Sequence, residues 1–242
     1  MKVFQANKIR KLSLIVMSLL TICVTTFYYF SLNSTVAVSS AVVQPIRNGN
    51  RNTNKVALMF NCYENVEIVK QISDTLKEYG FHATFFLGGC FIDDNIELIK
   101  YLVEGGHELG NHGYFHKEHS KLSFSQNLLE IENCHNIVKA HTGIEMNLFA
   151  PPSGDYNKTT VEVCKKNGYK VILWSLDTID WRDKSEKIVY NRATQKITGG
   201  DFVLMHPKLH TLKALPDILN FYLQKGLVVT TVSQCMENNG QS

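Results

Sequence analysis

The chain from Lys55 onward alternates short apolar runs with longer segments of helical periodicity. The first apolar run covers residues 56–60, and the segment after it places Ile68, Ile72 and Leu76 at helical spacing. About seven such strand–helix units follow one another, without a detectable internal repeat. Repeated units of this size predict an α/β fold with a parallel sheet, either open or closed as a barrel. Periodicity alone does not distinguish the two.

The expected elements alternate regularly along the domain. Glycines or glycine pairs follow most of the helices, as is common where helices end. Ser123 is placed to cap the N-terminus of the longest helix. The expected strands cover residues 56–60, 83–87, 107–111, 148–150, 171–176, 202–205 and 228–232. The expected helices cover residues 66–79, 96–104, 123–141, 158–167, 186–197 and 212–224.

The N-terminal segment is typical of export. Four basic residues in the first eleven positions precede an uncharged run over residues 12–32, which as a helix would be about 31 Å long. We predict a signal anchor over residues 1–32 that crosses the cell membrane once. A cleaved signal peptide is the alternative, because small residues surround Ala37. Both place the domain outside the cytoplasm, with a linker over residues 33–54 and a single domain over residues 55–242.

Charge and cysteine content exclude several classes. The net charge is +3 and the domain has no run of Lys and Arg, so no nucleic-acid partner is expected. None of the six cysteines forms a CxxC pair, and their spacing predicts neither a zinc ribbon nor a disulfide framework.

Polar side chains gather where the predicted strands end. In parallel α/β folds the reactive residues lie at the carboxyl ends of the strands, on one rim of the sheet. Five predicted strand ends carry such residues, which argues for a site at this rim. They are Asn61 and Cys62, then His112 and His116, then Asp155, then Asp177, Asp180 and Trp181, and finally His206.

Three of these residues form a candidate metal site. His112 and His116 are four residues apart, a spacing that puts both imidazoles on one face of a helical turn. With Cys62 as a third ligand they make a set suited to zinc and poorly suited to magnesium or calcium. The alternative is that both histidines belong to the surface or the core. A histidine with an aspartate partner, as His206 would have, is a common general acid or base, and Trp181 offers a flat face to a sugar ring.

The ordered motifs of the chain resemble the polysaccharide deacetylase family (carbohydrate esterase family 4, the NodB homology domain). The resemblance runs from Lys55 to the C-terminus and implies a distorted (β/α) barrel. It also implies removal of N-acetyl groups from GlcNAc- or MurNAc-type polymers such as peptidoglycan. The matching segments are V-A-L-M-F-N-C, G-N-H-G-Y-F-H, F-A-P-P-S-G-D-Y, D-T-I-D-W and V-L-M-H.

The resemblance also implies roles for individual residues. The family holds a divalent metal, commonly zinc, with one Asp and two His, and the matching positions make His112 and His116 metal ligands. His206 would be the acid, oriented by Asp177 or Asp180. We assign substrate binding to three residues of the matching segments: Pro152, Tyr156 and Trp181.

Three positions depart from the family pattern. Asn61 stands where the family has its general-base Asp, Cys62 where it has the metal-binding Asp, and Ala150 where an Arg positions the base. An amide cannot take a proton from water near neutral pH. Asn61 and Ala150, which replace the base and its Arg, are both uncharged. Losing only one of the two charges would leave the other buried and unpaired, which is costly, so the paired change indicates a remodelled site.

Two functions fit this altered site. One is a zinc-dependent hydrolase of carbon–nitrogen bonds, with Glu64 or Asp155 as a substitute base. The other is a pseudoenzyme of the same fold that binds cell-wall glycan or serves in morphogenesis, having lost the general base. In its F-N and A-P-P-S-G segments the chain resembles sporulation-associated deacetylase-like proteins of spore-forming bacteria. A third and weaker possibility makes Cys62 a covalent nucleophile. We favour the hydrolase, because the histidine positions persist.

Overall fold

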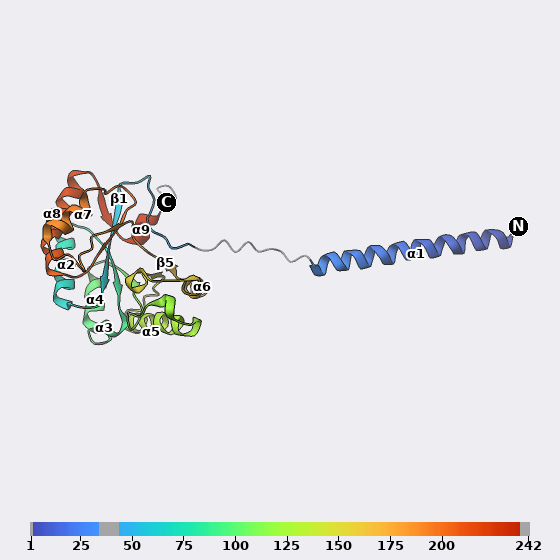
Figure 1. Cartoon of the computed structure of the whole chain (residues 1–242), viewed down its shortest axis with the longest axis horizontal. Coiled ribbons are helices and arrows are strands. Elements are labelled where there is room, and N and C mark those ends of the chain that lie inside the picture. The colour runs from blue at the N-terminus through green and yellow to red at the C-terminus, as the bar shows by residue number, and fades with distance from the viewer. Residues whose placement is uncertain (1, 34–43, 238–242) are drawn as a thin grey trace. The chain divides into compact units, whose positions relative to one another are not determined.

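The computed structural model describes residues 2–33 and 44–237. It divides into two compact units, residues 1–42 and 43–242. The first unit contains α1 (Lys2–Asn33), so the predicted N-terminal helix is present (Figure 1). Among the described residues, no helix combines the length and apolar character needed to cross a membrane. Crossing of the membrane by this segment stays a prediction. The predicted linker lies partly outside the described residues, but Ile46 and Asn48 bridge to Ile172 and Asp201 of the domain.

The second unit contains every strand and helix that the sequence predicts. Its strands are β1 (Lys55–Cys62), β2 (Thr84–Leu87), β3 (Glu108–Asn111), β4 (Leu148–Phe149), β5 (Lys170–Val171), β6 (Leu176–Asp177), β7 (Phe202–Met205) and β8 (Val228–Thr230). Its helices are α2 (Val66–Glu78), α3 (Gly89–Asp93), α4 (Ile96–Glu104), α5 (Phe124–Thr142), α6 (Lys158–Lys166), α7 (Glu186–Thr194), α8 (Leu209–Gln224) and α9 (Val232–Met236), with 3₁₀ turns η1 (His119–Lys121) and η2 (Pro152–Gly154).

The element boundaries differ from the prediction in a few places. The single strand expected over residues 171–176 is divided into β5 and β6, because the backbone between them bonds elsewhere: Leu173 donates to Ile46 and Ser175 to Phe202. The short helices α3 and α9 were not predicted. The cap of α5 is confirmed, since Ser123 accepts from the backbone N–H of Gln126.

The strands form one parallel sheet, as predicted. Seven of them follow the order β5-β4-β3-β2-β1-β7-β6, and β8 pairs with the first residues of β1. No pairing joins β5 to β6 in the described part of the chain, so the sheet is an open barrel. The fold is therefore the predicted α/β barrel with eight strands where about seven were expected.

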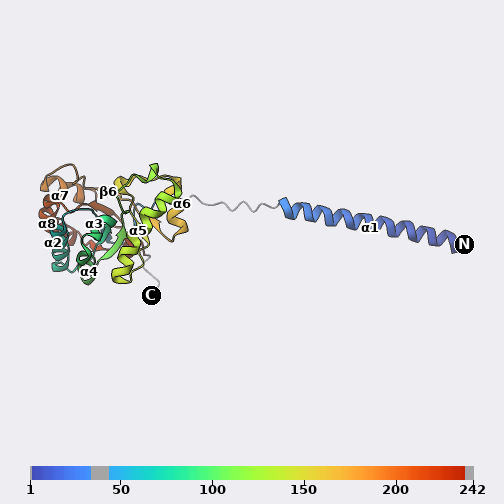
Figure 2. The same cartoon turned by 90° about the horizontal axis from the view of Figure 1, so that it is seen from below.

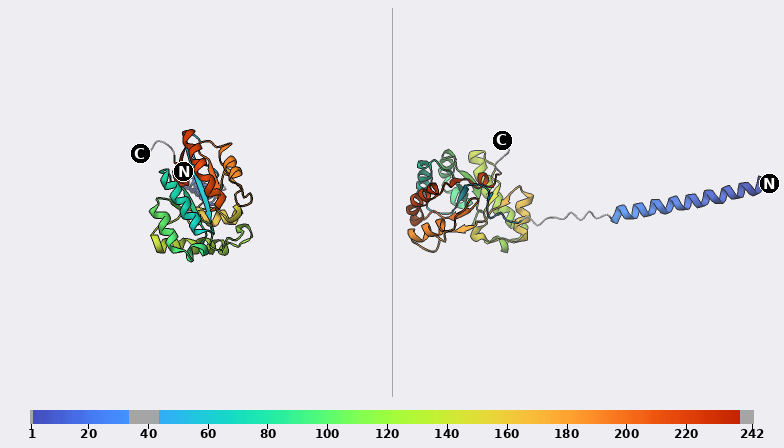
Figure 3. Two further views of the ribbon diagram at one scale, coloured as in Figure 1. Left: turned by 90° about the vertical axis from the view of Figure 1, so that its left-hand side faces the viewer. Right: turned by 90° about the horizontal axis from the view of Figure 1, so that it is seen from above.

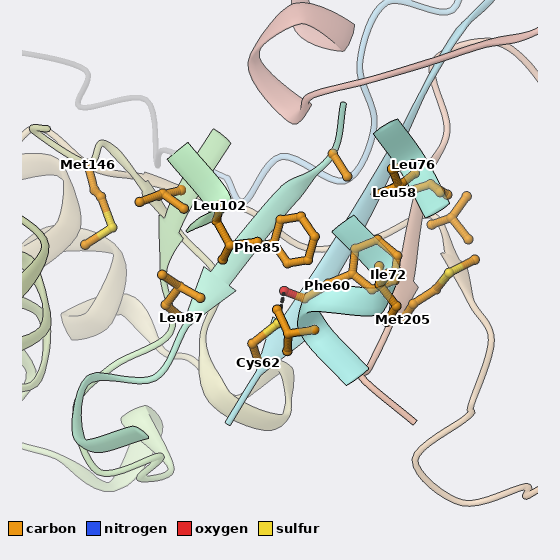
Figure 4. Packing of buried hydrophobic residues seen from close by; sticks show 14 of the residues in the cluster. Leu58, Phe60, Cys62, Ile72, Leu76, Phe85, Leu87, Leu102, Met146 and Met205 are labelled. Carbon is orange, nitrogen blue, oxygen red and sulfur yellow. Dashed lines mark hydrogen bonds between the residues drawn. The ribbon is translucent and has the colours of Figure 1, made fainter. Parts of the chain in front are cut away.

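Helices cover the outside of this sheet. They follow one another in the order α7, α8, α2, α4, α5 and α6, each in contact with the next (Figure 2). Figure 3 shows α8 and α2 side by side, although more than a hundred residues separate them in the sequence. Apolar side chains from the sheet and these helices form the main core, part of which is shown in Figure 4.

Alternation along β1 sorts its side chains between two regions. Leu58, Phe60 and Cys62 pack into the main core with the helices, whereas Ala57 and Met59 belong to a smaller cluster on the other face of the sheet. Successive residues of a strand point to opposite faces. Asn61 therefore shares a face with Ala57 and Met59, and Cys62 does not.

Candidate active site

A pocket of about 630 Å³ opens where β1, β3, β6 and β7 end. It brings together residues from all four strand ends, as the rim of a parallel sheet would. Seven residues that the sequence singled out for the site line it: Asn61, Glu64, His112, His116, Asp177, Trp181 and His206. Five further residues complete the lining: Tyr63, Ser153, Trp174, Leu204 and Pro207.

His206 is held by Asp180. Nδ1 of His206 lies 2.7 Å from Oδ1 of Asp180, and the backbone N–H of His206 donates to Oδ2 over 2.7 Å. The Thr211 hydroxyl donates to the same oxygen. A carboxylate only accepts, so the proton of the neutral imidazole sits on Nδ1 and the lone pair of Nε2 is free. Burial raises the pKa of Asp180, but the bonds from His206 and Thr211 outweigh it and leave the pKa below its usual value.

This arrangement decides between the two aspartates that the sequence left open. Asp180, which is 1% exposed, orients His206. Asp177 lines the pocket and accepts from the backbone N–H of Ile179 over 2.7 Å, in a turn where Ile179 has φ of 51°. Burial raises the pKa of Asp177.

His112 and His116 meet through a loop, and the predicted helical turn is wrong. Their ring centroids are 5.1 Å apart at an interplanar angle of 74°. The backbone between them cannot be helical, because Gly113 and His116 both have positive φ, 73° and 54°. Nδ1 of His112 donates to the carbonyl of Ala150 over 2.7 Å, which leaves Nε2 unprotonated. Burial, followed by the nearby His116, lowers the pKa of His112 to about 3, and burial also lowers that of His116.

Glu130 of α5 fixes this loop, and the sequence reasoning missed it. Its buried carboxylate accepts from the backbone N–H groups of Tyr114 (2.9 Å) and Phe115 (2.7 Å) and pairs with Lys117 at 3.3 Å. The available signal was the pattern of α5, in which Glu130 shares the buried face with Asn127, Ile131 and other core residues.

Cys62 does not join the two histidines. Its side chain is fully buried among apolar residues on the helix-facing side of β1, where the thiol donates to the Phe60 carbonyl over 3.6 Å (Figure 4). Burial raises the pKa of this thiol far above its usual value, so it fits neither a thiolate ligand nor a nucleophile. The predicted set of Cys62, His112 and His116 is therefore not formed, because neighbours on a strand face opposite ways.

A metal held by three protein ligands does not fit the residues that the structure brings together. Within residues 2–33 and 44–237, no three His, Cys, Asp or Glu side chains are grouped so that they could hold a metal ion. His112 and His116 lie side by side, but Cys62, the third member of the predicted set, packs in the main core on the other side of the sheet.

The altered positions Asn61 and Ala150 are both buried and neutral. Asn61 is 5% exposed and lines the pocket, whereas Ala150 lies in the smaller apolar cluster behind it. Of the two substitute bases, Glu64 lines the pocket and forms an ion pair with Lys208. Asp155 does not line it and accepts from the backbone N–H of Ser120 over 2.7 Å.

One of the three predicted substrate-binding residues lines the pocket. Trp181 does so and is 55% exposed. Pro152 is buried and Tyr156 packs against the main core, because the turn at Ser153, with φ of 55°, presents that residue to the pocket. Trp174 was missed, although an aromatic residue just before the D-x-x-D-W segment was a usable signal.

Comparison with protein families identifies the fold's relatives. The family model described as polysaccharide deacetylase matches residues 48–172, just over half of the 242-residue chain. The chain belongs to the polysaccharide deacetylase family. Relatives from Bacillus subtilis include the following two proteins. The uncharacterized protein YlxY is 29% identical over 209 residues, covering 86% of this chain and 66% of YlxY. The peptidoglycan-N-acetylmuramic acid deacetylase PdaC is 30% identical over 187 residues, covering 77% of this chain and 39% of PdaC.

The match therefore spans just under two thirds of one of these proteins and well under half of the other. Among solved structures, a CE4 family pseudoenzyme from Bacillus anthracis superposes with a TM-score of 0.78 at 30% identity, over 81% of this chain and 69% of the other. A mutant of that pseudoenzyme, described as having restored enzymatic activity, superposes equally well at 29% identity, over 81% of this chain and 72% of the mutant.

Proposed function

We propose that the chain is a hydrolase of the polysaccharide deacetylase type that acts on N-acetyl groups of a cell-wall glycan. The observation that carries the proposal is the His206–Asp180 pair at a pocket lined by the exposed Trp181. The pocket volume of about 630 Å³ lies within the range of roughly 300–1,000 Å³ usual for ligand sites. Relatives named as peptidoglycan deacetylases support the substrate class.

In this proposal His206 acts first as a base and then as an acid. Nε2 takes a proton from a water molecule while the water oxygen attacks the acetyl carbonyl carbon. The imidazolium then gives that proton to the sugar nitrogen as the carbon–nitrogen bond breaks, which releases acetic acid and a free amine. Asp180 keeps the proton on Nδ1 and stabilises the imidazolium. Among the described residues, His112 and His116 pair without a third metal-ligating side chain, so in this proposal both proton transfers fall to His206.

The test is acetate release from peptidoglycan and from N-acetylglucosamine oligomers by the full chain. His206→Ala should lower the rate by roughly 10²–10⁴-fold, the usual loss for a general acid or base. His141→Ala is the matched control, since His141 is exposed near the end of α5. Equal rates for the two variants would overturn the assignment of His206.

A second candidate function is glycan binding without turnover. The specific observations in its favour are Asn61 at the base position and Cys62 on the wrong face of the sheet. The pseudoenzyme from Bacillus anthracis among the similar structures is consistent with it. This candidate expects tight binding of N-acetylglucosamine oligomers with no acetate released by the native chain, whereas rapid native turnover would exclude it.

The substrate class also supports a location for the domain. Because a cell-wall glycan lies outside the cell membrane, we place the domain outside the cytoplasm. A fusion of the first 54 residues to a reporter enzyme that is active only after export tests this placement. An inactive but stably expressed reporter would contradict it.

A further inference from the structure

Asn61 has an unused acceptor at the pocket. Its Oδ1 is buried without a hydrogen-bond partner, and the side chain as a whole is 5% exposed. The described residues contain one other such atom, Nε2 of His119, and His119 does not line the pocket. A buried polar atom without a partner is costly, so it is seldom kept unless something else binds it. The position of Asn61 therefore points to a ligand that donates a hydrogen bond.

The acceptor lies beside the reacting histidine. β1 and β7 are adjacent and parallel, with Phe60 opposite Met205. Asn61 follows Phe60 on β1, and His206 is the first residue after β7, so the two residues are neighbours. A ligand atom attached to the scissile acetyl group would lie near both. In an N-acetyl sugar, the nitrogen of that group carries one hydrogen and is a donor.

Asn61 itself offers no counter-charge to a cation bound against it. Its side chain is neutral. Of the two carboxylates that line the pocket, Glu64 pairs with Lys208, and Asp177 accepts from the backbone N–H of Ile179 through Oδ1. A protonated amine placed against Asn61 would lose its hydration without gaining a counter-charge from that residue, whereas the uncharged acetamide would not incur that cost.

We propose that Asn61 selects N-acetylated over de-N-acetylated amino sugars, with its Oδ1 accepting the N–H of the acetamido group. This inference rests on the proposed glycan function and names the chemical form that the pocket prefers. An aspartate at this position would shift the preference toward the deacetylated sugar, because its carboxylate would attract the ammonium group and Ala150 supplies no cation to neutralise it, unlike the Arg of the family pattern.

The experiment compares two tetramers, one of N-acetylglucosamine and one of glucosamine, at a pH at which the glucosamine amine is protonated. Dissociation constants are measured by calorimetry for the full chain and its variants, with acetate quantified in the same samples. The native chain should prefer the acetylated tetramer. Asn61→Asp should shift the ratio of affinities toward the glucosamine tetramer by roughly tenfold or more. Trp181→Ala should weaken both tetramers by similar factors, because a flat ring stacks on either sugar.

A second variant protects the test against misfolding of the first. Asn61→Ala removes the acceptor without adding charge and should weaken the acetylated tetramer by roughly fivefold, with little change for the other. An unchanged ratio in both Asn61 variants, each still binding glycan, would overturn the inference and leave the proposed function standing. Failure of the native chain to bind or hydrolyse either tetramer would overturn the proposed function itself.

Discussion

Asp180 holds His206 at two points, through Nδ1 of the ring and through the backbone N–H, each over 2.7 Å. The residues are 26 positions apart and come from the loops after β6 and β7, which are adjacent in the sheet. Because both oxygens of Asp180 accept, the ring orientation and the tautomer of His206 are fixed together.

Asp180→Asn should lower acetate release by roughly 10²–10⁴-fold, because an amide nitrogen can place a donor against Nδ1 and favour the wrong tautomer. Asp177→Asn is the matched comparison. Its amide oxygen can still accept from the Ile179 backbone, so we expect a loss of less than about tenfold. Steady-state rates with N-acetylglucosamine oligomers measure both, and a larger loss in Asp177→Asn would reverse the roles given to the two residues.

Cys62→Asp should destabilise the domain by about 3 kcal/mol or more, because it places a carboxyl group in the apolar core. Cys62→Ala, which leaves only a small cavity, should cost about 1 kcal/mol. Urea unfolding with and without added zinc distinguishes these outcomes. A Cys62→Asp chain of native stability that binds one equivalent of zinc would show that residue 62 reaches the pocket.

Acid should weaken the fold between about pH 3 and 6.5. Burial lowers the pKa of His112 to about 3 and that of His107, a buried residue just before β3, to about 4. Between those values and the usual 6.5, the unfolded chain binds protons that the folded chain excludes. Stability is therefore complete above pH 6.5 and falls with decreasing pH, by up to about 1.4 kcal/mol per pH unit for each histidine. Urea midpoints measured across this range should show a shallower slope in His112→Gln, and an identical slope would contradict the burial of His112.

Glu130→Gln should loosen the loop that carries His116. Both backbone N–H groups donate to the same oxygen, Oε2, and a glutamine loses the negative charge that strengthens these two hydrogen bonds and pairs with Lys117. Hydrogen exchange at the amides of Tyr114 and Phe115 should accelerate by roughly tenfold or more, and acetate release should fall by a similar factor. Glu132→Gln, an exposed neighbour on α5, should leave both unchanged. Unaltered hydrogen exchange in Glu130→Gln would show that Glu130 does not position the loop.

Several features of the site could be predicted from local sequence. The strand ends that carry Asn61, His112, Asp177 and His206 follow from apolar runs bounded by polar residues, and parallel strands bring such ends to one rim. The cap at Ser123 and the glycine after the same helix, which is Gly143, depend on neighbours a few residues away, and the structure confirms both. The loop between His112 and His116 was predicted wrongly, because its positive φ angles are supported by Glu130 from another element.

The sequence by itself determined the parallel α/β barrel, the rim that carries the site and the membership in the polysaccharide deacetylase family, since these depend on periodicity and on the order of motifs. Only the tertiary structure decided that Asp180 orients His206, that Cys62 faces the core and that Asn61 faces the pocket. Strand alternation requires residues 61 and 62 to face opposite ways, but which face carries the pocket depends on how the helices pack on the sheet. Likewise, the partner of His206 depends on β6 lying beside β7, a contact between segments distant in the sequence.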